Sequence, residues 1–175
     1  MAISPPHRLV RGHPEGGEGS QQLIANGLQQ IASKDGNIVK TVSLSLSTEG
    51  TCDLREITRQ VSEAVNDSGV TDGIVTVFVP GATGGVTTIE FEPGAIRDFQ
   101  DFMERSIPSE GVYRHNERWG DGNGFSHVRA ASLGPSLTVP FKDRELLLGT
   151  WQQIVVADFD NGPRQRQVIL QILGE

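Results

Sequence analysis

The sequence is poor in the residues that mark secreted, zinc-caged and membrane proteins. It holds one cysteine, Cys52, in 175 residues, which excludes an internal disulfide and a cysteine zinc cage. The longest apolar run, residues 74–80, is far shorter than the ~20 residues of a membrane span. The first residues contain no apolar signal core. We therefore expect a cytoplasmic protein without a membrane partner.

Positive charge is also scarce. Fifteen Lys and Arg against twenty-two Asp and Glu leave a formal net charge of −7, which repels a phosphate backbone and argues against nucleic-acid binding. A local basic pocket for a small phosphorylated ligand remains compatible with this balance, because a pocket depends on the charges around it. The length fits one domain with a sizeable core.

Residues 1–37 differ in composition from the rest of the chain. Several prolines and the run Gly16-Gly17-Glu18-Gly19 are typical of a flexible extension, either a mobile tail or a docking arm. Apolar residues at helical spacing predict a short helix within it, at about 20–33. We expect residues 38–175 to form the folded domain.

From residue 39 onward, strand and helix patterns follow one another. Val42, Leu44 and Leu46 alternate with serines, as in a half-buried strand. Asp53 is interpreted as the N-cap of a helix that stops at Gly69.

A second helix is predicted at about 95–106, with core residues Ile96, Phe99, Phe102 and Met103. Further strands are predicted at 74–80, 86–92, near 128, and at 137–141, 146–159 and 165–173, with a long loop after Pro108. The order β-α-β-β-α-loop-β-β-β-β predicts an α+β domain with two helices.

The turn at residues 81–85 is the first of three places where polar chemistry gathers. Small residues let a ligand approach the backbone, and the Thr83 hydroxyl with the amides of Gly84 and Gly85 could hold an anion. Alternation along the following strand places Glu90 on the face opposite Ile89, toward a partner or a site. A Gly-rich hairpin with a solvated acidic face is the alternative interpretation.

The second place is the loop at residues 113–127, which collects two histidines, two asparagines, a tryptophan and an aspartate between glycines. Binding groups concentrate on such loops. His115, Asp121 and His127 could ligate a metal such as Zn²⁺ or Mg²⁺, with Glu90 completing a mixed nitrogen and oxygen site. The alternative is a pair of hydrogen-bonded histidines that orders the loop.

Trp151 and Gln152 form the third place, just after Gly149. A tryptophan beside an amide can supply a wall and a hydrogen-bond handle for a heteroaromatic ring. The spacing alone favours a buried core tryptophan instead.

Six segments of the chain carry a resemblance to a known family: VPGATGGVTTIE at 79–90, DGNG at 121–124, SHVRA at 126–130, LGPSLTVP at 133–140, GTWQQI at 149–154 and VILQILGE at 168–175. Taken in order, they resemble the YjbQ-like proteins, also called the secondary thiamine-phosphate synthase family, over roughly residue 39 to the C-terminus. Many relatives carry histidine where this chain has Gly81. A sub-branch with a Gly-Ser-Thr-like turn is more similar to this sequence, and it carries histidine where this chain has Phe125.

The resemblance implies a β-sandwich-like α+β domain that assembles as a homotrimer. It also implies a weak activity that couples a hydroxymethylpyrimidine diphosphate to a thiazole phosphate, giving thiamine phosphate and pyrophosphate. The family's best-marked positions match His127, Asn123 and Glu90 as catalytic candidates and the Trp151-Gln152 pair as substrate-binding candidates.

Three functions are compatible with these residues. In a transferase, Arg129 would share a strand face with His127, and both would meet the diphosphate together with the amides of residues 83–85, with or without Mg²⁺. The second function is a non-catalytic trimer that binds a small ligand or acts as a scaffold. The third is a metal-dependent hydrolase that uses His115, His127 and Glu90 around an activated water.

For all three functions, we expect one pocket, which could lie at a subunit boundary and which accepts a small phosphorylated or anionic molecule. The pocket residues expected are His127, Glu90, Asn123 and Trp151.

Overall fold

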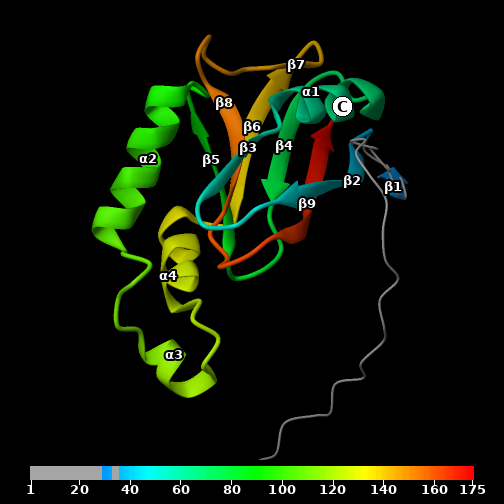
Figure 1. Ribbon diagram of the computed structural model, residues 1–175. Coiled ribbons are helices and arrows are strands. Elements are labelled where there is room, and N and C mark those ends of the chain that lie inside the picture. The colour runs from blue at the N-terminus through cyan, green and yellow to red at the C-terminus, as the bar shows by residue number, and fades with distance from the viewer. Residues whose placement is uncertain (1–28, 33–35) are drawn as a thin grey trace, which may run out of the picture.

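The computed structural model describes residues 29–32 and 36–175, and these residues form two antiparallel sheets packed face to face (Figure 1). One sheet has six strands in the order β1-β2-β9-β4-β6-β7, and the other has three in the order β3-β8-β5. The strands are β1 Gln29–Ala32, β2 Ile38–Thr48, β3 Asp53–Glu56, β4 Gly73–Phe78, β5 Gly84–Ile89, β6 Ser136–Lys142, β7 Glu145–Leu146, β8 Gln153–Asp158 and β9 Arg164–Gly174.

The helices are α1 Thr58–Ser68, α2 Pro93–Ser106, α3 Arg114–Trp119 and α4 Gly124–Leu133. The predicted α+β class is confirmed, whereas the predicted count of two helices is wrong. The segment expected to be a loop and then a strand near residue 128 folds as α3 and α4. The buried pair Phe125 and Arg129 lies at i and i+4, the spacing of one helix face. The flanking glycines interrupt the chain often enough to hide that period.

The core lies between the two sheets. Val168, Leu170 and Ile172 of β9, which lie in the strand predicted at 165–173, point inward in alternation. In β8, Ile154 and Val156 face the six-stranded sheet. Strand β8 is nevertheless buried on both faces, because α2 and α4 cover the other side of the three-stranded sheet (Figure 1). This double burial explains the unbroken apolar run in β8.

Helix α1 starts later than predicted. Asp53 is not an N-cap: it belongs to β3, where it pairs with Asp158 of β8, and its carboxylate accepts bonds from the Glu49 amide and the Arg55 side chain. The helix stops at Gly69, which takes the left-handed conformation at φ 75° as expected.

In α2, Met103 is buried as predicted, but Phe102 is wrongly assigned to the core, because 52% of it is exposed. The helix also begins earlier than predicted. Glu92 is its N-cap, and the carboxylate accepts bonds from the amides of Gly94 and Ala95.

Two further boundaries differ from the prediction. The expected strand at 146–159 is split into β7 and β8, which leaves Trp151 in the loop between them. Strand β1 occupies residues 29–32, where a helix was expected; the rest of the predicted extension lies outside the described residues, apart from Gly36 and Asn37. No helix in the described part of the chain is long and apolar enough to cross a membrane.

Candidate functional site

The turn between β4 and β5 meets α4 through a histidine. The Nδ1 atom of His127, on α4, lies 3.0 Å from the carbonyl oxygen of Ala82. A carbonyl oxygen can only accept a hydrogen bond, so Nδ1 carries the proton in the neutral ring. The Nε2 atom of His127 therefore keeps its lone pair.

A second histidine lies against the first. The ring centroid of His115, on α3, is 4.4 Å from that of His127, and the two ring planes are tilted by 55°. The Nε2 atom of His115 is 3.3 Å from a carboxylate oxygen of Asp121. Because a carboxylate is an acceptor, it favours the proton on Nε2 and leaves the lone pair on Nδ1. These two rings with Asp121 and Ala82 are called the two-histidine site.

Two buried polar atoms lie in the first turn of α4. Asn123 is the residue that precedes the helix, and its Oδ1 atom has no hydrogen-bond partner within the described residues; the same holds for the Oγ atom of Ser126, which is fully buried. Buried polar atoms are normally paired. Asn123 lies in the same segment as the two-histidine site, but no hydrogen bond joins its side chain to either ring in the described part of the chain, and its catalytic role stays a prediction.

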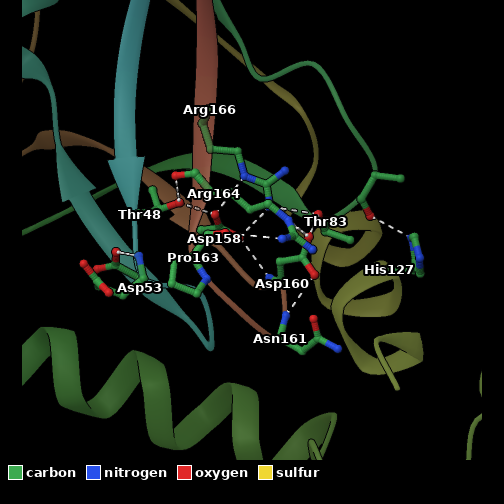
Figure 2. A network of polar contacts seen from close by, with 12 residues as sticks. Thr48, Asp53, Thr83, His127, Asp158, Asp160, Asn161, Pro163, Arg164 and Arg166 are labelled. Carbon is green, nitrogen blue, oxygen red and sulfur yellow. Dashed lines mark hydrogen bonds and ion pairs between the residues drawn. The ribbon is translucent and has the colours of Figure 1, made fainter. Parts of the chain in front are cut away.

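A buried group of charged side chains supports the turns beside this site (Figure 2). Arg166 donates to both carboxylate oxygens of Asp158, at 2.8 and 2.5 Å, and lies 3.6 Å from Asp160. Thr48 also donates to Asp158. Thr48, Thr83, Asp158, Asp160 and Arg166 are all less than 9% exposed and are called the ionic cluster.

Electrostatics in the ionic cluster favour charged carboxylates. Burial raises the pKa of Asp158, but hydrogen bonds from Arg166, Thr48 and the Asp160 amide outweigh burial and leave that pKa below its usual value. The same balance holds for Asp160. Burial raises its pKa, but hydrogen bonds from Arg164, the Asn161 amide and Thr83 outweigh burial and leave that pKa below its usual value.

In the predicted anion cradle at the β4–β5 turn, the Thr83 hydroxyl is engaged in contacts within the chain. The Thr83 hydroxyl bonds Asp160 and accepts from Arg166. A Cβ atom on Gly85 would lie 2.8 Å from the carbonyl oxygen of Gly134, and one on Gly84 would lie 3.2 Å from a methyl group of Val79. The two glycines therefore allow β5 to pack closely against its neighbours.

Arg129 is not placed to meet a ligand. Its side chain is 1% exposed, and it donates to a carboxylate oxygen of Glu104 at 2.6 Å and to the carbonyl of Ile107 at 2.7 and 2.9 Å. The expectation that it shares a strand face with His127 is wrong, because α4 is a helix and residues two apart point about 200° apart around its axis. Phe125 is buried as well, with its ring 5.0 Å from the Arg129 guanidinium.

Glu90, Trp151 and Gln152 lie at the opposite end of β5. Gly84 pairs with Asp158, whereas Ile89 pairs with Gln153, and five strand residues span roughly 17 Å. Gln152 donates to the Thr88 hydroxyl at 3.1 Å at that far end. Trp151 is 69% exposed, so the core interpretation of this residue is wrong.

Within one chain, therefore, His127 and Asn123 do not share a pocket with Glu90 and Trp151. A pocket that combines them across a subunit boundary stays a prediction. Among residues 29–32 and 36–175, no three His, Cys, Asp or Glu side chains are arranged to hold a metal ion. The metal role of His115, His127 and Asp121 stays a prediction too, although the structure brings the three together.

Sequence reasoning missed the ionic cluster. The segment between the strands predicted at 146–159 and 165–173 contains none of the candidate site residues predicted from the sequence. The available signal was a pair of aspartates, Asp158 and Asp160, at the end of an apolar run, followed by Arg164 and Arg166 on the next strand. Acidic groups in a run that must be buried need a cation nearby.

A YjbQ-like family model, described as UPF0047 protein YjbQ-like, matches residues 42–175. A UPF0047 protein of Archaeoglobus fulgidus is 37% identical over 132 residues, which cover 75% of this chain and all of that protein. The UPF0047 protein YugU of Bacillus subtilis is 30% identical over 133 residues, which cover 75% of this chain and 98% of that protein.

Solved structures of YjbQ-like proteins have a fold similar to that of this chain. A YbjQ-like protein of unknown function from Sulfolobus solfataricus superposes with a TM-score of 0.75 at 29% identity and covers 79% of this chain and 99% of that one. An uncharacterised YjbQ/UPF0047 protein from Clostridium acetobutylicum gives a TM-score of 0.68 at 37% identity and covers 74% and 98%. Sequence and fold together place this chain in the YjbQ-like, UPF0047 family.

Proposed function

We propose that this protein binds a small phosphorylated molecule at the two-histidine site, with His127 as the residue that contacts it. The observation that supports this function is the pairing of the two rings. Each imidazole has one nitrogen bound to an oxygen of the chain, and its other nitrogen keeps a lone pair. Side chains held in this way are prepared to exchange a proton with a ligand.

The surroundings of the rings support a small ligand at the surface. The side chain of His115 is 34% exposed and that of Asp121 is 44% exposed, so solutes reach the site without a large opening. A neutral imidazole accepts a proton from a phosphate hydroxyl, and the protonated ring then pairs with the phosphate oxygens. A phosphate group therefore suits either protonation state of the pair.

Native mass spectrometry tests this proposal, with inorganic phosphate, pyrophosphate and thiamine phosphate as probes. We expect binding of at least one probe to the wild-type chain and its loss in His127→Ala. Gln152→Ala, at the other end of β5, is the matched control and should bind as the wild type does. Equal binding by His127→Ala would overturn the proposed site.

The thiamine-phosphate synthase activity implied by the family resemblance is a second, more demanding function. It needs groups that stabilise the departing pyrophosphate, yet Arg129 and Thr83 are engaged within the chain. We therefore put ligand binding before catalysis. Pyrophosphate release from a hydroxymethylpyrimidine diphosphate and a thiazole phosphate, measured with and without Mg²⁺, decides between them: release that disappears in His127→Ala would favour the synthase.

We further propose that the chain forms the homotrimer that the resemblance implies and that the outer face of the six-stranded sheet takes part. On that face Ile74 of β4 pairs with Leu173 of β9, and the next apolar pair along the strands is Phe78 with Ile169. Ile74, Phe78 and Leu173 are about 40% exposed, and apolar groups of this kind are typical of the centre of an interface. Sedimentation at a trimer mass, reduced in Phe78→Lys, is the expected result, and a monomer mass for the wild type at micromolar concentration would contradict it.

A further inference from the structure

We infer that the ionic cluster is a positioning device that holds both histidines of the two-histidine site in fixed and opposite tautomers. This inference rests on the proposed function of that site. It assigns Thr83, Asp160 and Arg166 a role beyond the stability of the fold, because two chains of hydrogen bonds lead from them to the two rings.

The first chain of bonds leads to His127. Arg166 donates to the Thr83 hydroxyl at 2.8 Å, and that hydroxyl donates to Asp160 at 3.1 Å. The Thr83 carbonyl accepts from the Phe159 amide at 2.9 Å. The Thr83 nitrogen belongs to the same planar peptide unit as the Ala82 carbonyl. Fixing Thr83 therefore fixes the oxygen that accepts from His127 (Figure 2).

The second chain of bonds leads to His115. One carboxylate oxygen of Asp160 accepts from the Asn161 amide at 2.9 Å. The Asn161 side chain then donates to the backbone carbonyl of Asp121 at 2.7 Å, and the Asp121 carboxylate faces His115 at 3.3 Å. Asp160 is the branch point, because its other oxygen bonds Thr83 and Arg164.

The two chains of hydrogen bonds place the proton on a different nitrogen in each ring. The carbonyl of Ala82 selects the Nδ1–H form of His127, whereas the carboxylate of Asp121 selects the Nε2–H form of His115. The cluster that supports both acceptors is buried and its charges are paired, so it is a rigid base for two groups that are themselves open to solvent. A site prepared in this way has its ligand-binding nitrogens set before the ligand arrives.

The test measures histidine tautomers by nitrogen NMR in the full chain without ligand. The chain has four histidines, so His115→Gln and His127→Gln assign the two signals. Thr83→Val keeps the shape of the side chain and removes its hydroxyl, and Thr83→Ser restores the hydroxyl. Asn161→Ala removes the donor to Asp121 and leaves the Thr83 bonds in place.

We expect Thr83→Val to convert the single Nδ1–H form of His127 into a mixture of tautomers while His115 is unchanged, and Thr83→Ser to restore the single form. Asn161→Ala should do the reverse, so that His115 becomes mixed and His127 is unchanged. Unchanged tautomers in both variants, or the same change at both rings in each variant, would overturn the inference. If neither phosphate nor pyrophosphate binds while His127 keeps the Nδ1–H form and His115 keeps the Nε2–H form, the proposed function alone is overturned.

Discussion

The two ends of β5 carry polar side chains of opposite character. At the Gly84 end, Thr83, Asp158 and Arg166 are buried and bond one another, and they support turns that contact His127. At the Ile89 end, Glu90 and Trp151 are exposed. Buried bonds therefore fix the geometry of the first end, which is what the proposed function needs. The second end presents the side chains of Glu90 and Trp151 to solvent.

Removal of the Arg166 cation from the ionic cluster should give the largest difference in stability between the two ends of β5. We expect Arg166→Met to lower the free energy of unfolding by about 3–5 kcal/mol, because it leaves a buried carboxylate without its partner. Urea unfolding measures this loss. Arg164→Met is the control: its side chain is 47% exposed, and Asp160 keeps its bonds from Thr83 and the Asn161 amide and its contact with Arg166, so we expect a smaller loss than for Arg166→Met. A loss below about 1 kcal/mol for Arg166→Met would show that the cluster does not stabilise the Gly84 end.

Acid should weaken the same end by protonating its carboxylates. The pKa values of Asp158 and Asp160 are lowered in the folded chain, so the unfolded state takes up protons first as the pH falls. The contribution of the cluster is complete above the unfolded pKa of about 3.9 and is lost as the pH falls through the folded values. Urea unfolding from about pH 6 to about pH 3 should show this decline in the wild type and a shallower one in Arg166→Met. An equal slope in both proteins would contradict the assignment to these two aspartates.

Close packing of β5 should give a smaller effect. Gly85→Ala places a Cβ atom 2.8 Å from the Gly134 carbonyl and 3.0 Å from a methyl group of Leu133. We expect a loss of about 1–3 kcal/mol in the free energy of unfolding, since overpacking forces the end of α4 away from β5. Gly162→Ala is the control, because a Cβ atom added there would meet nothing within 4 Å and the φ of Gly162 is not left-handed. If both variants unfold alike, β5 and α4 are not tightly packed here.

The smallest effect is expected at the far end. Trp151→Ala should change the free energy of unfolding by less than about 0.5 kcal/mol, because the side chain is 69% exposed. The His127 tautomer should also stay as in the wild type. Urea unfolding, sedimentation and the nitrogen spectrum measure the three responses. A loss above about 1 kcal/mol that depends on protein concentration would show instead that Trp151 is buried in an assembly, and it would bring the two ends of β5 together across subunits.

Much of the fold followed from local pattern. Alternation at residues 42–46 and 165–173 located β2 and β9, because each strand has one face in the core. The helix stop at Gly69 followed from the left-handed conformation that glycine adopts cheaply. The segment at 114–133 was not predictable in this way. Its two short helices are interrupted by glycines, and α4 gains its stability from packing on β5 and from the buried side chain of Arg129.

For the candidate site, the amino-acid order alone established which residue types gather on the loop at 113–127, and His115, His127 and Asp121 do meet there. It took the folded chain to place Glu90 and Trp151 at the other end of β5 and to turn Arg129 inward. The same is true of the ionic cluster, whose members come from β2, β8, β9 and two turns. The physical reason is that composition specifies which groups can bond, whereas strand register and the burial of a charge decide which partners they reach.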